Sequence, residues 1–176
     1  MLTIRVEIPG PPHAQMRPRT RVVAIGGKKP FAQVYDAPES KSWKGAAQVH
    51  MQRAMEGMPA LTCPVRIRIL AVFELPVSKH RKAALPRAHY VGQKDWENVA
   101  KAVCDAGNGV LWVDDRQVAR AEVRCIVGAQ GEAPRLIIRV DEITAEEQPG
   151  TWVEVEDVSR NADAAAQERP AQAAKS

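Results

Sequence analysis

Residues Pro64–Pro76, "PVRIRILAVFELP", carry the clearest strand signal in the chain. An apolar set, Val65, Ile67, Ile69, Ala71 and Phe73, alternates with Arg66, Arg68, Leu70 and Glu74. Alternation with a period of two places one set on each face of a strand. The stretch therefore predicts a sheet with one buried face and one arginine-bearing face.

Two segments have the period of amphipathic helices. From Pro38 onward, one face would carry Trp43, Ala47, Met51, Ala54 and Met58, and Gly57 and Pro59 would end the helix. We expect its methionines to lie in the core. In the second segment, Val99, Ala102, Val103 and Ala106 keep a helical period until Gly107-Asn108-Gly109 interrupts it.

Further strands are predicted on either side of these helices. Residues 2–8 alternate in the same way up to Pro9, and strands are also expected around 118–127 and 135–143. The Gly26-Gly27 pair would close a hairpin between 20–25 and 31–35. This order predicts an α+β fold, with a mixed or antiparallel sheet and two helices packed on one face.

The charge of the chain is unevenly distributed. Residues 1–145, the predicted domain, hold 22 Lys and Arg against 14 Asp and Glu, whereas residues 146–176 hold 3 against 7. We expect 146–176 to be an acidic, alanine-rich and largely disordered tail, with a short strand possible at "TWVEVEDV". The basic body suggests a polyanionic partner, leaving nucleic acid, anionic lipid and solubility open as explanations.

Several classes of protein are excluded by pattern. The N-terminus lacks the features of a signal peptide and no apolar run could cross a bilayer, so we expect a cytoplasmic protein that does not bind membranes. Cys63, Cys104 and Cys125 lack C-x-x-C spacing, which predicts core cysteines rather than disulfides or a zinc site. The four histidines show no metal-ligand spacing either.

The stretch Lys94–Asp115, "KDWENVAKAVCDAGNGVLWVDD", gathers five carboxylates. One interpretation is local: Asp95 caps the helix, Glu97 favours its positive end, and Asp114-Asp115 is a solvated turn. That interpretation does not explain Lys101 on the acidic face. A Mg²⁺ ion explains it, because Mg²⁺ binds carboxylates together with substrate phosphate, whose charge a lysine would meet.

The pattern D-x-E-N-x-x-K-x-x-x-D, followed by a glycine turn and V-L-W-x-D-D-x-Q-V, resembles the core signature of the RusA family of Holliday junction resolvases. The resemblance spans roughly residues 1–145 and includes a proline-rich first turn and an R-P-R segment. It implies a metal-dependent endonuclease of DNA recombination and repair. The family's usual form is K-P-D-x-D-N, so this chain departs from it at Glu97 and in lacking a proline before Asp95.

The resemblance also implies roles for individual residues. Asp95, Glu97 and Asp115 correspond to the metal-binding acids and Lys101 to the essential lysine, and Asp114 matches a further acidic position that we include among the metal ligands. The implied cofactor is Mg²⁺, with Mn²⁺ possible, and no small-molecule cofactor is expected. Asn98 would orient a carboxylate or a metal-bound water, unless it is only a residue of the first helical turn.

Two basic clusters are predicted to contact DNA phosphates, unless they are solvated loops. They comprise Arg17, Arg19 and Arg21, then Lys79, Arg81, Lys82 and Arg87, with Lys94 at the start of the motif. The implied partners are a four-way DNA junction and a second copy of the chain, since family members are homodimers. Two alternatives remain: a nuclease of this fold for other branched DNA, and a junction-binding protein with weakened catalysis.

Overall fold

The computed structural model describes residues 2–23, 26, 29–35 and 37–144. Residues 1–143 form one compact unit, and residues 144–176 are a separate unit. The predicted tail, residues 146–176, with its possible strand at 151–158, lies outside the described residues.

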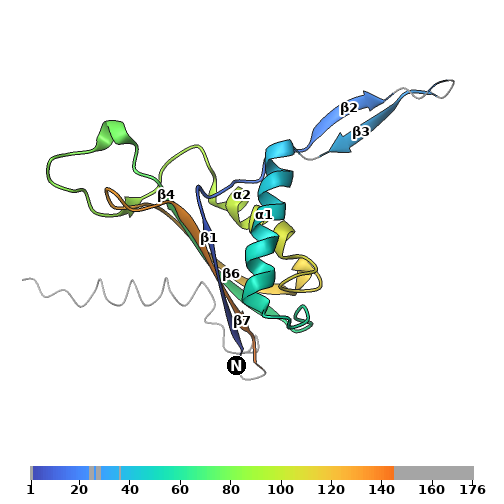
Figure 1. Cartoon of the computed structure of the whole chain (residues 1–176). Coiled ribbons are helices and arrows are strands. Elements are labelled where there is room, and N and C mark those ends of the chain that lie inside the picture. The colour runs from blue at the N-terminus through green and yellow to red at the C-terminus, as the bar shows by residue number, and fades with distance from the viewer. Residues whose placement is uncertain (1, 24–25, 27–28, 36, 145–176) are drawn as a thin grey trace, which may run out of the picture. The chain divides into compact units, whose positions relative to one another are not determined.

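Five strands form the main sheet, in the order β1-β7-β4-β6-β5 (Figure 1). They are β1 (Thr3–Pro9), β4 (Val65–Phe73), β5 (Ala88–His89), β6 (Val118–Val127) and β7 (Arg135–Glu142). Strands β4 and β6 are parallel, and the other neighbours are antiparallel. The sheet is therefore mixed, which the sequence left open. Parallel neighbours need a crossover connection, and here it contains η1 (Val77–Lys79), β5 and the second helix.

Two helices, α1 (Pro38–Met55) and α2 (Trp96–Gly107), cover one face of this sheet (Figure 1). One buried cluster joins Ala47 and Met51 of α1 and Val99 and Val103 of α2 to the inward side chains of β1, β4 and β7. The predicted alternation of β4 is confirmed, since Val65, Ile67, Ile69, Ala71 and Phe73 are all buried. Among the described residues, no helix is both long and apolar enough to cross a membrane.

The end of α1 differs from the prediction for Met58. Glu56 and Gly57 take left-handed backbone conformations, with φ of 49° and 83°, and end the helix. Met58 therefore leaves the helical period and is 38% exposed, so its predicted core position is wrong. Met51 and Met55 are buried as expected.

The three cysteines lie at the margin of the core rather than inside it. Each is free and half-buried, and each packs against the buried cluster. The three thiols are free in the described structure, and their partial burial differs from the predicted core positions.

A separate two-stranded ribbon forms between β1 and α1. Its strands, β2 (Arg19–Val23) and β3 (Phe31–Tyr35), pair antiparallel, as the predicted hairpin requires. The ribbon projects beyond the N-terminal end of α1 (Figure 1), and all its residues are exposed except Val23, which is half-buried.

Candidate active site

The first turn of α2 presents the first acids of the predicted site. Asp95 occupies the N-cap position but accepts no hydrogen bond from the helix backbone. Instead, Asn98 Nδ2 donates to Asp95 Oδ2 at 3.4 Å. Glu97 and Lys101 point into solvent from the same helix. The Asp95 carboxylate is thus oriented by an amide and is not consumed by capping.

The turn after α2 is fixed by a buried tryptophan. Trp112 is fully buried, and its ring lies so close to Gly107 that a Cβ there would come within 2.4 Å of it. Trp112 Nε1 donates to Asn108 Oδ1 at 3.0 Å, and Gly109 has a positive φ of 72° that favours glycine. The Gly-Asn-Gly turn therefore packs against Trp112 and holds it in place, which fixes the position of the next two acids, Asp114 and Asp115.

The acid pair itself is held by Gln117. The short helix η2 (Asp115–Gln117) begins with a reciprocal cap in which Asp114 and Gln117 each bond the other's backbone. Gln117 Nε2 also donates to the carbonyls of Leu61 and Cys63, both at 2.9 Å. Gln117 and Trp112 were given no role from the sequence, although both belong to the L-W-x-D-D-x-Q pattern that carried the resemblance.

The two acids of the pair have different surroundings. Arg116 grips Asp114 through two side-chain hydrogen bonds of 2.9 and 2.8 Å, and these bonds hold the pKa of Asp114 far below its usual range. Its predicted role as a metal ligand would require this guanidinium to move. Asp115 is exposed, and in the described part of the chain no cation lies within 4 Å of it.

Asp115 lies beside the second half of α2. Burial first, and then the negative charges of Asp115 and Asp105, together raise the pKa of Cys104 to about 11. Among the described residues, no group of three or more His, Cys, Asp or Glu side chains is arranged to hold a metal ion. The carboxylates are nevertheless the oxygen ligands that Mg²⁺ prefers, and one or two suffice when substrate phosphate supplies the others.

The loop that follows β1 is hydrogen-bonded to the start of α2. Gln15 N donates to the Asn98 carbonyl, and Lys94 Nζ donates to the Pro12 carbonyl, each at 2.8 Å. The loop is tied to α1 as well, through His13 Nε2 and Ser40 Oγ at 2.9 Å. Burial, and next the charge of Lys94, lower the pKa of His13. Lys94, predicted to contact DNA, thus also has a structural bond.

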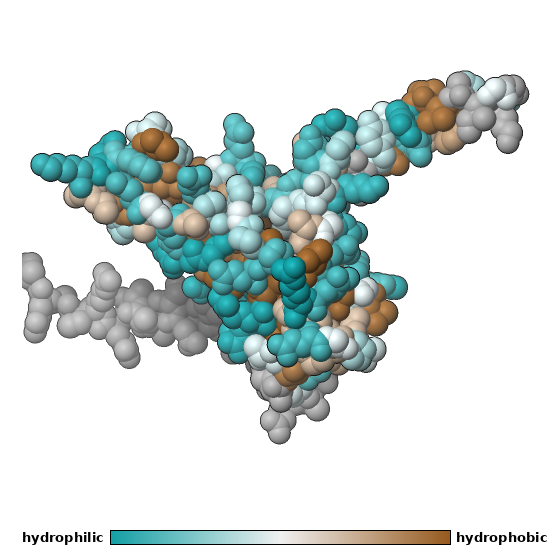
Figure 2. All heavy atoms as spheres, in the orientation of Figure 1, coloured by the Kyte–Doolittle hydropathy of each residue, from teal (hydrophilic) through white to brown (hydrophobic). Residues whose placement is uncertain are grey.

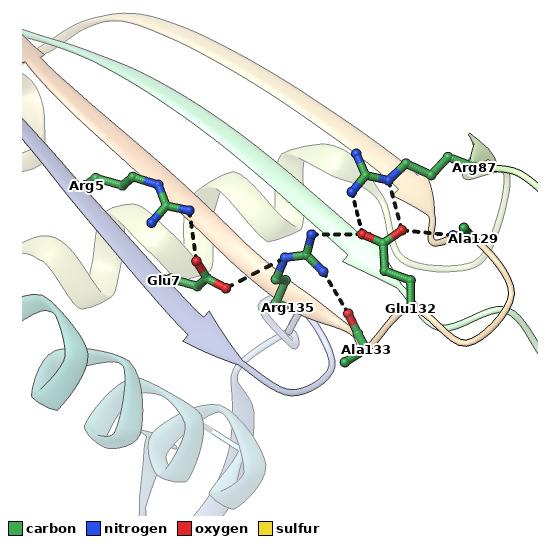
Figure 3. A network of polar contacts seen from close by, with 7 residues as sticks. All are labelled: Arg5, Glu7, Arg87, Ala129, Glu132, Ala133 and Arg135. Atoms are coloured by element: carbon green, nitrogen blue, oxygen red, sulfur yellow. Dashed lines mark hydrogen bonds and ion pairs between the residues drawn. The ribbon is translucent and has the colours of Figure 1, made fainter.

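The predicted DNA-contacting residues fall into two groups. Those on the ribbon, just before it and on the loop after β4 are exposed: Arg17, Arg19, Arg21, Lys79, Arg81 and Lys82. Arg87 instead donates through Nε and Nη2 to the two carboxylate oxygens of Glu132 (Figure 3). The bonds from Arg87 first, then those from Ala129 N and Arg135, lower the pKa of Glu132 to about 2, so Arg87 already has an anionic partner.

Exposed acids on a helix start, beside exposed basic loops on an α+β scaffold, fit the nucleases as a class. The family model of endodeoxyribonuclease RusA matches residues 9–141. The match covers well over half of the chain, which belongs to the RusA family, the Holliday junction resolvases. The resemblance noted in the sequence is confirmed, and so is the α+β fold. No match was found among curated proteins.

Proposed function

We propose that the chain is a metal-dependent endonuclease that resolves four-way DNA junctions during recombination and repair. One observation carries the proposal. In the segment 94–117, the fold pairs Asp114 with Arg116 but leaves Asp95, Glu97 and Asp115 at the surface without an ion pair within 4 Å among the described residues. Neighbouring carboxylates repel one another, so their retention in one segment favours a site for a cation, and Lys101 on the same helix could meet the charge of a substrate phosphate.

The proposed ligands of the metal ion are Asp95, Glu97 and Asp115. A bound Mg²⁺ or Mn²⁺ ion would supply Lewis-acid activation of water and neutralise charge on the scissile phosphate. Asn98 would hold the Asp95 carboxylate in one orientation, as its 3.4 Å hydrogen bond already does. The cap formed by Asp114 and Gln117 would fix the position of Asp115 at the start of η2.

Lys101 is proposed to act on the phosphate directly. It lies four residues after Glu97 and four before Asp105, so these side chains share one face of α2. Its ammonium group is exposed and, in the described residues, makes no ion pair. It would therefore stabilise negative charge that develops on the phosphate oxygens or on the leaving oxygen as the P–O bond breaks.

The proposal is tested by cleavage of a fixed synthetic four-way junction beside a replication fork, each with and without Mg²⁺. A resolvase cuts the junction in preference to the fork and only with the ion. Equal cutting of both substrates would instead identify a nuclease for branched DNA in general. Binding of the junction without cutting in either Mg²⁺ or Mn²⁺ would identify a binding protein that has lost catalysis.

Resolution requires two cuts, and we propose that a homodimer makes them. A four-way junction has approximate two-fold symmetry, so two sites related by a dyad would meet opposite strands equivalently. A supercoiled plasmid with an extruded cruciform reports on this directly. Paired cuts within one binding event release linear plasmid, whereas independent cuts by monomers release nicked circles first.

A further inference from the structure

The β2–β3 ribbon is amphipathic across its two faces. Residues directly opposite one another in an antiparallel pair point to the same face. The pairs Arg19↔Tyr35, Arg21↔Gln33 and Val23↔Phe31 therefore define one face, which we call the arginine face although its last pair is apolar. The pairs Thr20↔Val34 and Val22↔Ala32 define the other, which we call the apolar face.

The arginine face is suited to a polyanion. No Asp or Glu occurs anywhere between residues 8 and 35, so the ribbon has no internal counter-charge. Arg21 is held in place by neutral groups: its Nε donates to Gln33 Oε1 at 2.9 Å, and its guanidinium lies 5.4 Å from the centre of the Tyr35 ring. These contacts orient the guanidinium without cancelling its charge.

The apolar face has no cover in the described structure. Val22 is 74% exposed and Val34 66% exposed, and apolar surface is visible along the projecting ribbon (Figure 2). A two-stranded ribbon alone is only marginally stable in water. Extended apolar surface on such an element indicates a partner that buries it.

The ribbon is connected to the candidate active site through the loop that precedes it. In this loop, Gln15 N donates a hydrogen bond to the Asn98 carbonyl at the start of α2. At the root of the ribbon, Tyr35 lines an open pocket of about 720 Å³ together with Lys41 and Lys44 of α1. Positive charge thus runs along the ribbon to α1, beside the helix that holds Asp95 and Lys101.

We propose that the ribbon enters the branch point of the DNA junction and confers selectivity for branched over linear DNA. This inference rests on the proposed function, because it takes the junction as the substrate. The arginine face would contact the converging phosphates, and Val22 and Val34 would pack against base pairs at the branch point. The charge of the ribbon favours DNA over a protein as the occupant of this surface.

The branch point differs from linear duplex in what it offers to an apolar face. Within a duplex, base pairs are stacked, and an apolar side chain can reach their faces only by unstacking a step, which costs a few kcal/mol. At an open branch point those faces are already exposed. The apolar face would therefore gain binding energy from a junction without that cost, whereas the arginine face would bind both kinds of DNA through phosphates.

The test measures binding of the full chain to a fixed four-way junction and to a linear duplex, with EDTA present so that no cleavage occurs. One variant replaces Val22 and Val34 by Ser, and a second replaces Arg19 and Arg21 by Gln. Val77→Ser is the matched control, because Val77 is also 74% exposed but lies in η1. Circular dichroism and sedimentation of each protein report on folding and self-association.

We expect the double valine variant to bind the junction about tenfold more weakly, the loss expected for about 1.4 kcal/mol, with duplex affinity unchanged. The double arginine variant should bind both DNAs more weakly and show a salt slope smaller by about 1.8. Equal losses on junction and duplex in the valine variant, or no loss, would overturn the proposal. The proposal would also be overturned if the valine variant lost its dimer in sedimentation and its junction affinity fell only by the amount that this loss explains. Binding in EDTA gives these results whether or not the chain cleaves DNA, so a failure of the proposed function is seen separately.

Discussion

Charged side chains are arranged differently on the open face of the sheet and around α2. On the sheet face, Arg5 pairs with Glu7, and Arg135 joins Glu7 to Glu132 (Figure 3). Arg124 pairs with Glu122 on the same face. Around α2 and on the ribbon, the pair of Asp114 with Arg116 is the one ion pair found among the described residues, and the other charged side chains there reach solvent. The same residue types therefore serve two purposes, which the sequence alone does not separate.

Paired charges on the sheet face belong to the stability of the fold. Asp141 shows this most clearly: it is fully buried and accepts hydrogen bonds from Thr3, Arg68 and Arg139. Burial alone would raise its pKa, but these bonds outweigh burial and lower the pKa to about 2. The charges around α2 that form no ion pair do not stabilise the fold in this way, and we propose that the acids bind the metal ion and that Lys101 contacts the DNA.

The largest effect on folding is expected from Asp141→Asn. The variant leaves Arg68 and Arg139 without their shared carboxylate and should lower the free energy of unfolding by about 2 kcal/mol, less than for a fully buried pair because both guanidiniums reach solvent. Glu122→Gln, which breaks the exposed pair with Arg124, is the matched control and should cost at most about 0.5 kcal/mol. Chemical denaturation at neutral pH measures both.

The pH dependence of the same variant gives a second check. The folded-state pKa of Asp141 is depressed to about 2, so its stabilising contribution is present above the ordinary value of about 3.9 and is lost as the pH falls toward 2. The stability difference between wild type and Asp141→Asn should therefore shrink over that window. A difference that stays constant from neutral pH to pH 2 would show that the carboxylate charge is not the source.

A smaller effect, on DNA binding, should separate Lys79 and Lys82 from Arg87. We expect Lys79→Gln with Lys82→Gln to weaken junction binding about tenfold and to lower the salt slope by about 1.8, because each lost phosphate contact accounts for about 0.9. Arg87→Gln should change affinity less than about twofold, since Glu132 already holds that guanidinium. A larger loss for Arg87→Gln than for the lysine pair would reverse this assignment.

Local periodicity was sufficient to predict the main helices and strands, but it did not predict which strands pair with one another. The alternation of β4 and the helical period of α2 each report burial of one face, which is a local pattern. Strand β5 was missed because it is only the pair Ala88–His89 in a basic connection, joined to the end of β6. The parallel neighbours β4 and β6 depend on the crossover, which no local pattern specifies.

The acids of the site stay a prediction from the sequence, and the structure adds how they are held. Residue types, spacing and the resemblance to the family pattern predicted Asp95, Glu97, Lys101 and Asp115 as one site. The pairing of Asp114 with Arg116 was not anticipated, although the two lie only two residues apart. The pairing of Arg87 with Glu132 joins residues 45 positions apart, and contacts over such distances depend on the folded sheet.

The smallest effect is expected from Glu97→Asp. Glu97 is one methylene longer than the aspartate in the family pattern, and Mg²⁺ demands closer to ideal octahedral geometry than Mn²⁺. Wild type should therefore cut junctions faster with Mn²⁺, and Glu97→Asp should narrow the gap by raising the Mg²⁺ rate about threefold, or about 0.7 kcal/mol. Single-turnover rates with each ion measure this, and Glu97→Ala cutting as fast as wild type would remove Glu97 from the ligands.

The most direct test of the central claim compares cleavage with binding in Asp95→Asn and Asp115→Asn, using one synthetic four-way junction and Mg²⁺. Because both carboxylates are proposed to hold the ion and neither supports the fold through a cation, each variant should lose cleavage by at least about a thousandfold, or about 4 kcal/mol. Junction binding should stay equal or become tighter, since a negative charge near phosphate is removed. Wild-type cleavage rates in both variants would contradict the account, because unpaired acids around α2 would then have no part in the reaction.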